Sequence, residues 1–153
     1  MDANKEVNKM SMAMPRYNIR DTKKYYSELN NMALKGIEVI TFNSNNQGEE
    51  VSHIKTTYLD KLLDKLSFSP LIEKDAELGV HTVALNEIDL YGEGDSQEAA
   101  IKDLINSIIE YLTVYVEKID MFSRVESEFK QVYVLKLLRC NGDRAKIRKA
   151  IGF

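Results

Sequence analysis

Four cations near the start of the chain form the clearest candidate for a binding site. Arg20, Lys23 and Lys24 recur at spacings of three and four, which places them on one side of a helix, and Arg16 comes shortly before them. Cations on an exposed helix face contact nucleic-acid phosphates and release counterions, and this release dominates DNA affinity. Asp21 lies among them, and the alternative interpretation of the pattern is a solvated helix face.

Side chains that commonly support catalysis or metal binding are sparse. His53 and His81 fall in predicted strands without a cluster of further ligands at metal-binding spacing, and Cys140 has no second sulfur. The glycine-containing turn at 92–94 lacks the lysine of a phosphate-binding loop. We therefore predict a protein that is not an enzyme and that has no cofactor and no metal. The catalytic alternative is a site assembled from dispersed carboxylates.

The composition indicates a folded protein, with 44% hydrophobic and 29% charged residues and only two prolines. No apolar run approaches the roughly 20 residues that a membrane span requires. Residues 1–14 lack the hydrophobic segment of a secretory signal, and a single cysteine cannot form an internal disulfide. We expect a cytoplasmic protein with no membrane partner.

The net charge of −3 conceals basic ends and an acidic middle. Residues 1–36 sum to +3, residues 37–95 to −8, residues 96–138 to −2 and the last fifteen residues to +4. Such asymmetry suits a protein with two differently charged partners. The basic tail at 139–149 is either an additional DNA contact or a solvated terminal helix.

The elements that position the cations are predicted in the order helix, strand, strand, helix. Residues 1–15 are predicted to form a flexible arm that Pro15 closes. Asn18 is a suitable N-cap and Gly36 a suitable end for the first helix. Strands are predicted at 37–42 and 51–54, around a polar turn at 43–48, and a second amphipathic helix at 57–66. The apolar face of the first helix consists of Ile19, Thr22, Tyr26, Leu29 and Ala33.

The rest of the chain is predicted to be mainly helical. An irregular acidic stretch at 70–79 precedes one or two strands at 80–90, and a turn at 92–95 leads into a long helix, with Asp95 and Glu98 at capping-box spacing. Asp143 is expected to cap a short final helix. A further helix at 124–138 would carry the apolar face Val125, Phe129, Val132, Leu135 and Leu138.

Two segments near the start of the chain carry a family pattern. Residues 17–29, Tyr-Asn-Ile-Arg-Asp-Thr-Lys-Lys-Tyr-Tyr-Ser-Glu-Leu, combine early basic residues with a terminal Ser-Glu-Leu. Residues 34–40, Leu-Lys-Gly-Ile-Glu-Val-Ile, lead into the first predicted strand. The two segments resemble the opening helix and the start of the first strand of the Phd/YefM type of antitoxin from RelE/RelB-type toxin–antitoxin systems. A second strand and a leucine-rich helix follow in the family's order, so the resemblance covers about residues 16–66.

The resemblance implies an α+β fold. Residues 16–68 would form a helix–strand–strand–helix domain that dimerises and binds operator DNA, and residues 69–153 a strand–helix and helical extension. A two-fold dimer would present one basic helix to each half-site. A RelE-type toxin is the implied protein partner, and the acidic segment at 37–95 would complement a basic toxin electrostatically. The toxin-binding surface is expected among residues 67–153. By position, the resemblance assigns DNA binding to Arg16, Arg20, Lys23 and Lys24.

Two departures from the family pattern matter. Many relatives carry an arginine-rich turn between the strands, whereas residues 43–48 are uncharged here. The alternative function is therefore a protein-interaction module that has a Phd-like fold but does not bind DNA. The extension also replaces the family's short tail. Within residues 83–112 it weakly resembles HicB-type antitoxins, on the segment Gly-Asp-Ser-Gln-Glu-Ala-Ala at 94–100.

Overall fold

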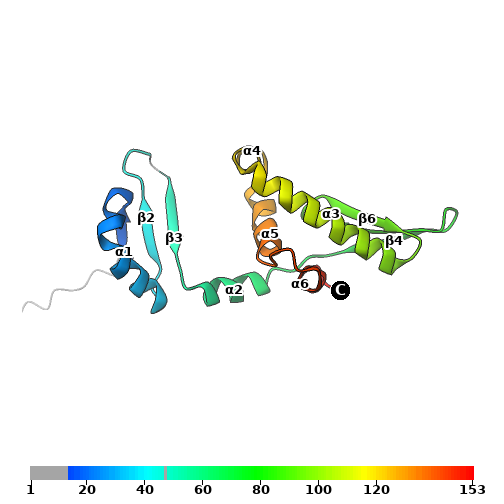
Figure 1. Cartoon of the computed structure of the whole chain (residues 1–153), viewed down its shortest axis with the longest axis horizontal. Helices are drawn as coiled ribbons and strands as arrows, with labels where there is room; N and C mark the ends of the chain where they lie inside the picture. The colour runs from blue at the N-terminus through cyan, green and yellow to red at the C-terminus, as the bar shows by residue number, and fades with distance from the viewer. Residues whose placement is uncertain (1–13, 47) are drawn as a thin grey trace, which may run out of the picture. The chain divides into compact units, whose positions relative to one another are not determined.

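The computed structural model describes residues 14–46 and 48–153, and most of the predicted arm lies outside them. The chain divides into two compact units, the first ending at Leu62 and the second spanning Leu63–Phe153. Each unit contains a three-stranded sheet with helices, and the predicted α+β class is confirmed. Figure 1 traces the course of the chain through both units. Among the described residues, no helix is long and apolar enough to cross a membrane.

Helix α1 (Ile19–Leu34) of the first unit has the ends that its sequence predicts. The Asn18 side chain accepts a hydrogen bond from the Arg20 amide at 3.2 Å, which satisfies one free donor of the first turn. Gly36 follows the helix with φ +95°, a conformation that favours glycine. Leu29 and Ala33 are buried as expected, because they face the sheet.

Three short strands form the sheet of the first unit. β1 (Arg16–Asn18) runs parallel to β2 (Val39–Phe42), and β2 pairs antiparallel with β3 (Glu50–His53). The prediction omitted β1, because three residues are too few to show a strand period and their pairing with β2 is non-local. The Ile40 amide donates to the Pro15 carbonyl at 2.9 Å and extends this pairing.

The predicted apolar face of α1 is only partly covered. Ile19 and Tyr26 are 58% and 62% exposed in the single chain, whereas Leu29 and Ala33 are buried. Helix α1 packs against β1 and β2, and its two buried residues, Leu29 and Ala33, lie in its C-terminal half. Helix α2 (Thr56–Asp64) then carries the chain from the first unit to the second.

The second unit opens with an antiparallel meander of β4 (Leu71–Asp75), β5 (Val80–Leu85) and β6 (Leu90–Gly94), drawn in green in Figure 1. The stretch at 70–79 was predicted to be irregular, but it contains β4. The charged residues of β4 have low strand propensity and mask the alternation of apolar and polar residues that predicts a strand. The turn predicted at 92–95 was also misplaced, because its glycines belong to β6.

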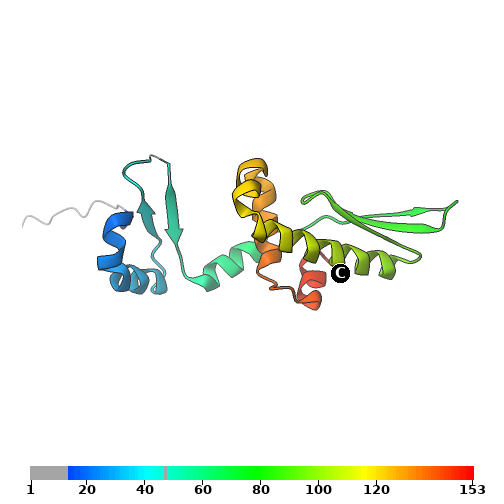
Figure 2. The same cartoon turned by 45° about the horizontal axis from the view of Figure 1, so that its top comes forward.

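Helix α3 (Gln97–Glu117) lies along one face of this sheet, as Figure 2 shows. The Ser96 hydroxyl, and not the predicted Asp95 side chain, caps it by accepting from the Ala99 amide at 3.1 Å. Because Gly92 has no side chain, the backbone of α3 approaches β6 closely at this point. The core of the unit is apolar and includes Val83, Leu85, Leu104, Ile108, Leu137 and Ile147.

Three further helices complete the unit: α4 (Ile119–Val125), α5 (Glu128–Leu138) and α6 (Arg144–Ala150). The helix predicted at 124–138 is interrupted because the Ser127 hydroxyl caps α5, accepting from the Lys130 amide at 3.2 Å. The predicted cap of α6 by Asp143 is confirmed.

The apolar face predicted for the helix at 124–138 is largely exposed. Phe129 is 64% exposed, whereas Tyr133, Val134 and Leu137 are buried. The helix is apolar on nearly all sides, so the same spacing fits two faces and periodicity alone could not choose between them.

The beginning and the end of the second unit lie together. The Tyr133 hydroxyl donates to the Ser67 carbonyl at 3.2 Å, and the Lys136 ammonium donates to the Leu66 carbonyl. A Cβ atom at Gly152 would be in ordinary contact with Pro70, 3.8 Å from its Cγ. Helices α5 and α6 therefore fasten the segment that leads into β4.

Candidate nucleic-acid interface

Arg16 lies in β1 and has two partners within the first unit. Its guanidinium forms an ion pair with Glu50 of β3 and stacks over the Phe42 ring of β2, 5.1 Å from the ring centre. The sheet order β1-β2-β3 brings these three strands together. Arg16 is exposed, but Glu50 neutralises its charge locally, so Arg16 is a weaker phosphate ligand than its type suggests.

Arg20 lies in the first turn of α1 and reaches the turn between β2 and β3. Its Nη2 atom is 3.5 Å from the Ser44 hydroxyl, at the limit of a weak hydrogen bond. The side chain is exposed, and the N-terminal end of the helix adds a partial positive charge beside it. Arg20 and the turn thus occupy one end of the first unit.

Lys23 and Lys24 follow on the exposed side of α1. The Lys24 ammonium lies over the Tyr25 ring, 5.2 Å from its centre, and this contact leaves the cation at the surface. With Arg20, they form a set of three exposed cations on one helix, which we call the α1 cation set. The prediction that these positions face outward agrees with their exposure, and their role in DNA binding stays a prediction.

The turn between β2 and β3 carries acidic side chains at its end. Glu49 accepts hydrogen bonds from the side-chain amides of Asn43, at 3.1 Å, and Asn46. Glu50 follows it and pairs with Arg16. The turn therefore departs from the arginine-rich turn of the resembled family in two ways: residues 43–48 are uncharged, and carboxylates lie at its end. Sequence reasoning missed the pairing of Arg16, which depends on a non-local strand register.

His53 and Cys140, which were considered for catalysis, have surroundings that indicate structural roles. His53 Nε2 lies 3.2 Å from the Thr41 hydroxyl across the β2–β3 pair. Cys140 is buried, and this burial raises the pKa of its thiol, which disfavours the nucleophilic thiolate. Within the part of the chain that is described, no group of three or more His, Cys, Asp or Glu side chains could hold a metal ion.

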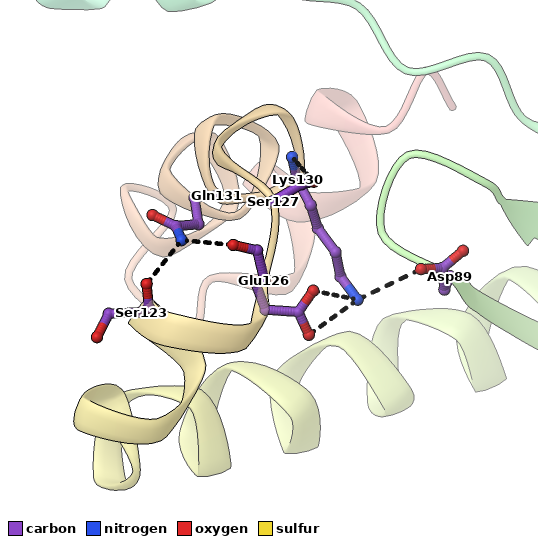
Figure 3. A network of polar contacts seen from close by, with 6 residues as sticks. All are labelled: Asp89, Ser123, Glu126, Ser127, Lys130 and Gln131. Carbon is purple, nitrogen blue, oxygen red and sulfur yellow. Dashed lines mark hydrogen bonds and ion pairs between the residues drawn. The ribbon is translucent and has the colours of Figure 1, made fainter.

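A polar network of the second unit connects helix ends, as Figure 3 shows. Lys130 of α5 contacts Glu126 at 3.1 Å and Asp89 at 3.4 Å, and Gln131 donates to the Glu126 carbonyl at 2.9 Å. Burial opposes the charge on Lys130, but hydrogen bonds to Glu126 and Asp89 and the nearby Tyr111 hydroxyl together raise its pKa. This network holds the α4–α5 junction beside the β5–β6 turn.

A bidentate ion pair accounts for one cation of the basic tail. Arg148 of α6 contacts Glu98 of α3 through two hydrogen bonds of 2.7 and 2.8 Å. These bonds hold the pKa of Glu98 below its ordinary value and raise that of Arg148. Arg148 therefore joins two helices of the second unit and is not a free phosphate ligand.

A family model described as "Antitoxin of toxin-antitoxin, RelE / RelB, TA system" matches residues 12–151. The fold resembles a crystal structure described as "an antitoxin part of a putative toxin/antitoxin system" from Syntrophomonas wolfei subsp. wolfei, with a TM-score of 0.68 and 16% identity. That match covers 90% of this chain and 96% of the other. No curated protein matches the sequence.

The family match extends well beyond residues 16–66, the segment that resembles the Phd/YefM type. It reaches from before β1 to the last turn of α6, so it includes the elements of the second unit as well as those of the first. At 16% identity, the structural neighbour supports the fold alone. The chain belongs to the family of antitoxins of RelE/RelB-type toxin–antitoxin systems.

Proposed function

We propose that this antitoxin neutralises a RelE-type toxin by direct binding and that a homodimer binds operator DNA to regulate its own expression. Membership of the antitoxin family supports the toxin partner. The observation that carries the DNA-binding part is the α1 cation set, Arg20, Lys23 and Lys24, exposed on one helix. The mechanism is stoichiometric binding in the cytoplasm, where the operator lies, and involves no turnover.

Exposed apolar side chains of the first unit support the homodimer. Tyr26, Ile19 and Val51 are 62%, 58% and 59% exposed in the single chain. Large apolar groups exposed on so small a unit favour burial against another surface, and a two-fold dimer interface would bury those of both copies. A dimer would also present six cations of the α1 set to DNA, two from each of the three positions.

A salt-dependent mobility shift on the DNA upstream of the gene tests operator binding. Lys23→Ala removes one cation per chain and two per dimer, so the slope of log K against log salt should become shallower by about 2. Lys35→Ala is the matched control, since Lys35 lies at the other end of α1, roughly 16 Å along its axis from Lys24. The control should keep the wild-type slope.

Sedimentation of the purified chain tests the dimer. Tyr26→Asp should shift the protein to a monomer, because it places a charge in the proposed interface. Tyr91→Asp is the matched control: Tyr91 is exposed to a similar extent, 59%, but belongs to β6 of the second unit. If both variants sediment as the wild type does, the first unit is not the dimer interface.

The second candidate is an antitoxin that binds its toxin but not DNA. The ion pair of Arg16 with Glu50 and the carboxylate of Glu49 favour it, because they reduce the positive potential at one end of the cation set. No mobility shift at low salt, from a chain that still binds the toxin, would establish this candidate. Binding of the protein encoded beside this chain, tested by co-expression and co-purification, checks the part that both candidates share.

A further inference from the structure

The two edges of the sheet in the second unit differ. At β6, the Glu93 amide donates to the Asp103 carboxylate of α3 at 2.9 Å, so a side chain satisfies this edge donor. Gly92 of the same strand lies directly against the α3 backbone. The β6 edge is therefore covered by α3 and cannot accept another strand at this position.

The β4 edge is open in the second unit. All five residues of β4 are exposed, and in the described part of this unit β4 pairs with β5 alone. Leu71 and Ile72 are each 48% exposed and point to opposite faces of the sheet. An edge strand with apolar side chains on both faces and unpaired backbone groups is suited to pairing with another strand.

The register shows which backbone groups point outward. Because the Glu93 amide points away from β5, the pair Thr82–Glu93 exchanges no backbone hydrogen bonds, and Thr82 directs its amide and carbonyl toward β4. Thr82 pairs with Glu73, so Glu73 points inward. The alternation then directs the amides and carbonyls of Ile72 and Lys74 to the free edge.

The charge around this edge selects the kind of partner. Residues 71–79, which form β4 and the turn after it, carry three carboxylates against the single cation Lys74, a net charge of −2. A second copy of this chain would bring an equal negative charge against the first, which disfavours pairing of β4 with itself. A strand that carries Lys or Arg between apolar residues would meet opposite charge and apolar contacts together.

We propose that the β4 edge binds the toxin by strand addition: an extended basic segment of the toxin pairs with β4 and continues the β4–β5–β6 sheet. This inference rests on the proposed toxin-binding function. The outward groups of Ile72 and Lys74 supply the backbone hydrogen bonds, and Leu71 and Ile72 supply one apolar contact on each face. The surrounding carboxylates favour a basic strand and speed its association.

Amide hydrogen exchange of the full-length chain tests the pairing directly. The probe is the protein encoded beside this chain, added to the labelled antitoxin. In the free chain, the amides of Ile72 and Lys74 should exchange fast, while Glu73 should be protected by its bond to β5. In the complex, exchange at Ile72 and Lys74 should slow by about tenfold or more, as expected for newly formed backbone hydrogen bonds.

A pair of substitutions gives a second readout. Ile72→Pro removes an outward amide without breaking a bond to β5, a position where a proline is tolerated in an edge strand. It should weaken toxin binding by about tenfold or more, since one hydrogen bond is lost and the ring obstructs the added strand. Ile72→Thr keeps the amide and the branched side chain and should change affinity by about threefold at most.

The outcomes separate this inference from the proposed function. If the wild-type chain does not bind the neighbouring protein, the toxin-binding function fails and this inference fails with it. If the wild type binds but Ile72 and Lys74 gain no protection, the strand-addition proposal alone is overturned. A gain of protection that follows self-association of the antitoxin, without the toxin, would assign the edge to a second copy and also overturn it.

Discussion

Replacing Gly92 by alanine should separate the sheet from the helix in the second unit. A Cβ atom at this position would overlap the carbonyl oxygen of Ala100 and the amide nitrogen of Leu104, and it would lie 2.7 Å from the Leu104 Cα. All three are backbone atoms of α3, so no side-chain rotation relieves the overlap. Ordinary carbon–carbon contact is about 3.7 Å, so α3 must move away from β6 by roughly 1 Å.

The cost follows from what this movement opens. Ala100 and Leu104 are fully buried, and a gap of this size forfeits much of the contact energy of the side chains beside it. Overpacking of a well-packed core costs about 1–3 kcal/mol, and with rigid backbone on both sides we expect the upper value, about 3 kcal/mol. For a unit of this size, that corresponds to a fall in melting temperature of roughly 12–24 °C.

Thermal unfolding followed by circular dichroism measures this effect, with Gly79→Ala as the matched control. Gly79 lies in the β4–β5 turn with φ +65°, and a Cβ atom there would meet nothing within 4 Å. The only cost of the control substitution is therefore that of placing alanine in the left-handed conformation, about 1 kcal/mol. This cost should lower the melting temperature by roughly 4–8 °C. If Gly92→Ala lowers the melting temperature no more than Gly79→Ala does, the close approach of α3 to β6 is wrong.

Three further predictions concern polar groups of the second unit. Lys130→Met leaves the carboxylate of Glu126 without its main partner and should lower the free energy of unfolding, measured in urea, by about 2 kcal/mol. Adding Glu126→Gln should restore much of this loss, and no recovery of stability would contradict the pairing. Because the pKa of Glu98 is lower in the folded chain, the stabilisation from its pair with Arg148 is present above pH 4.5 and is lost as the pH falls through the folded-state pKa. Glu98→Gln should therefore show a smaller loss of melting temperature between pH 6 and pH 3 (about the range of this titration), and an unchanged pH profile would refute this. Because burial raises the pKa of Cys140, its thiol should react with a thiol reagent much more slowly in the folded chain than in denaturant, and equal rates would show that it is accessible.

The features that the sequence predicted well are those that depend on neighbouring residues. The ends of α1 follow from the Asn18 side chain and from Gly36, and the start of α6 follows from Asp143. Each of these caps involves residues within a few positions of one another, so their chemistry is legible without knowledge of the fold. The outward direction of the α1 cations was predictable for the same reason.

The features that were missed depend on contacts between distant residues. β1 and β4 are short strands defined by their partners β2 and β5, not by a pattern of their own. The ion pair of Arg16 with Glu50 requires the register of three strands, which the sequence alone does not specify. On α5, the choice of buried face depends on what packs against it, because apolar residues occupy nearly every side.

The closeness of Pro70 to Gly152 has a consequence for how the second unit can be combined with other segments. A module whose first and last residues are neighbours can be inserted, appended or circularly permuted with short connections, because no linker has to span its diameter. A segment joined after Phe153 would emerge beside the residues that lead into β4. In these residues, the carbonyls of Ser67 and Leu66 accept hydrogen bonds from the Tyr133 and Lys136 side chains. Fusion partners for binding assays should therefore be attached through a flexible spacer, so that they neither break these hydrogen bonds nor obstruct the β4 edge.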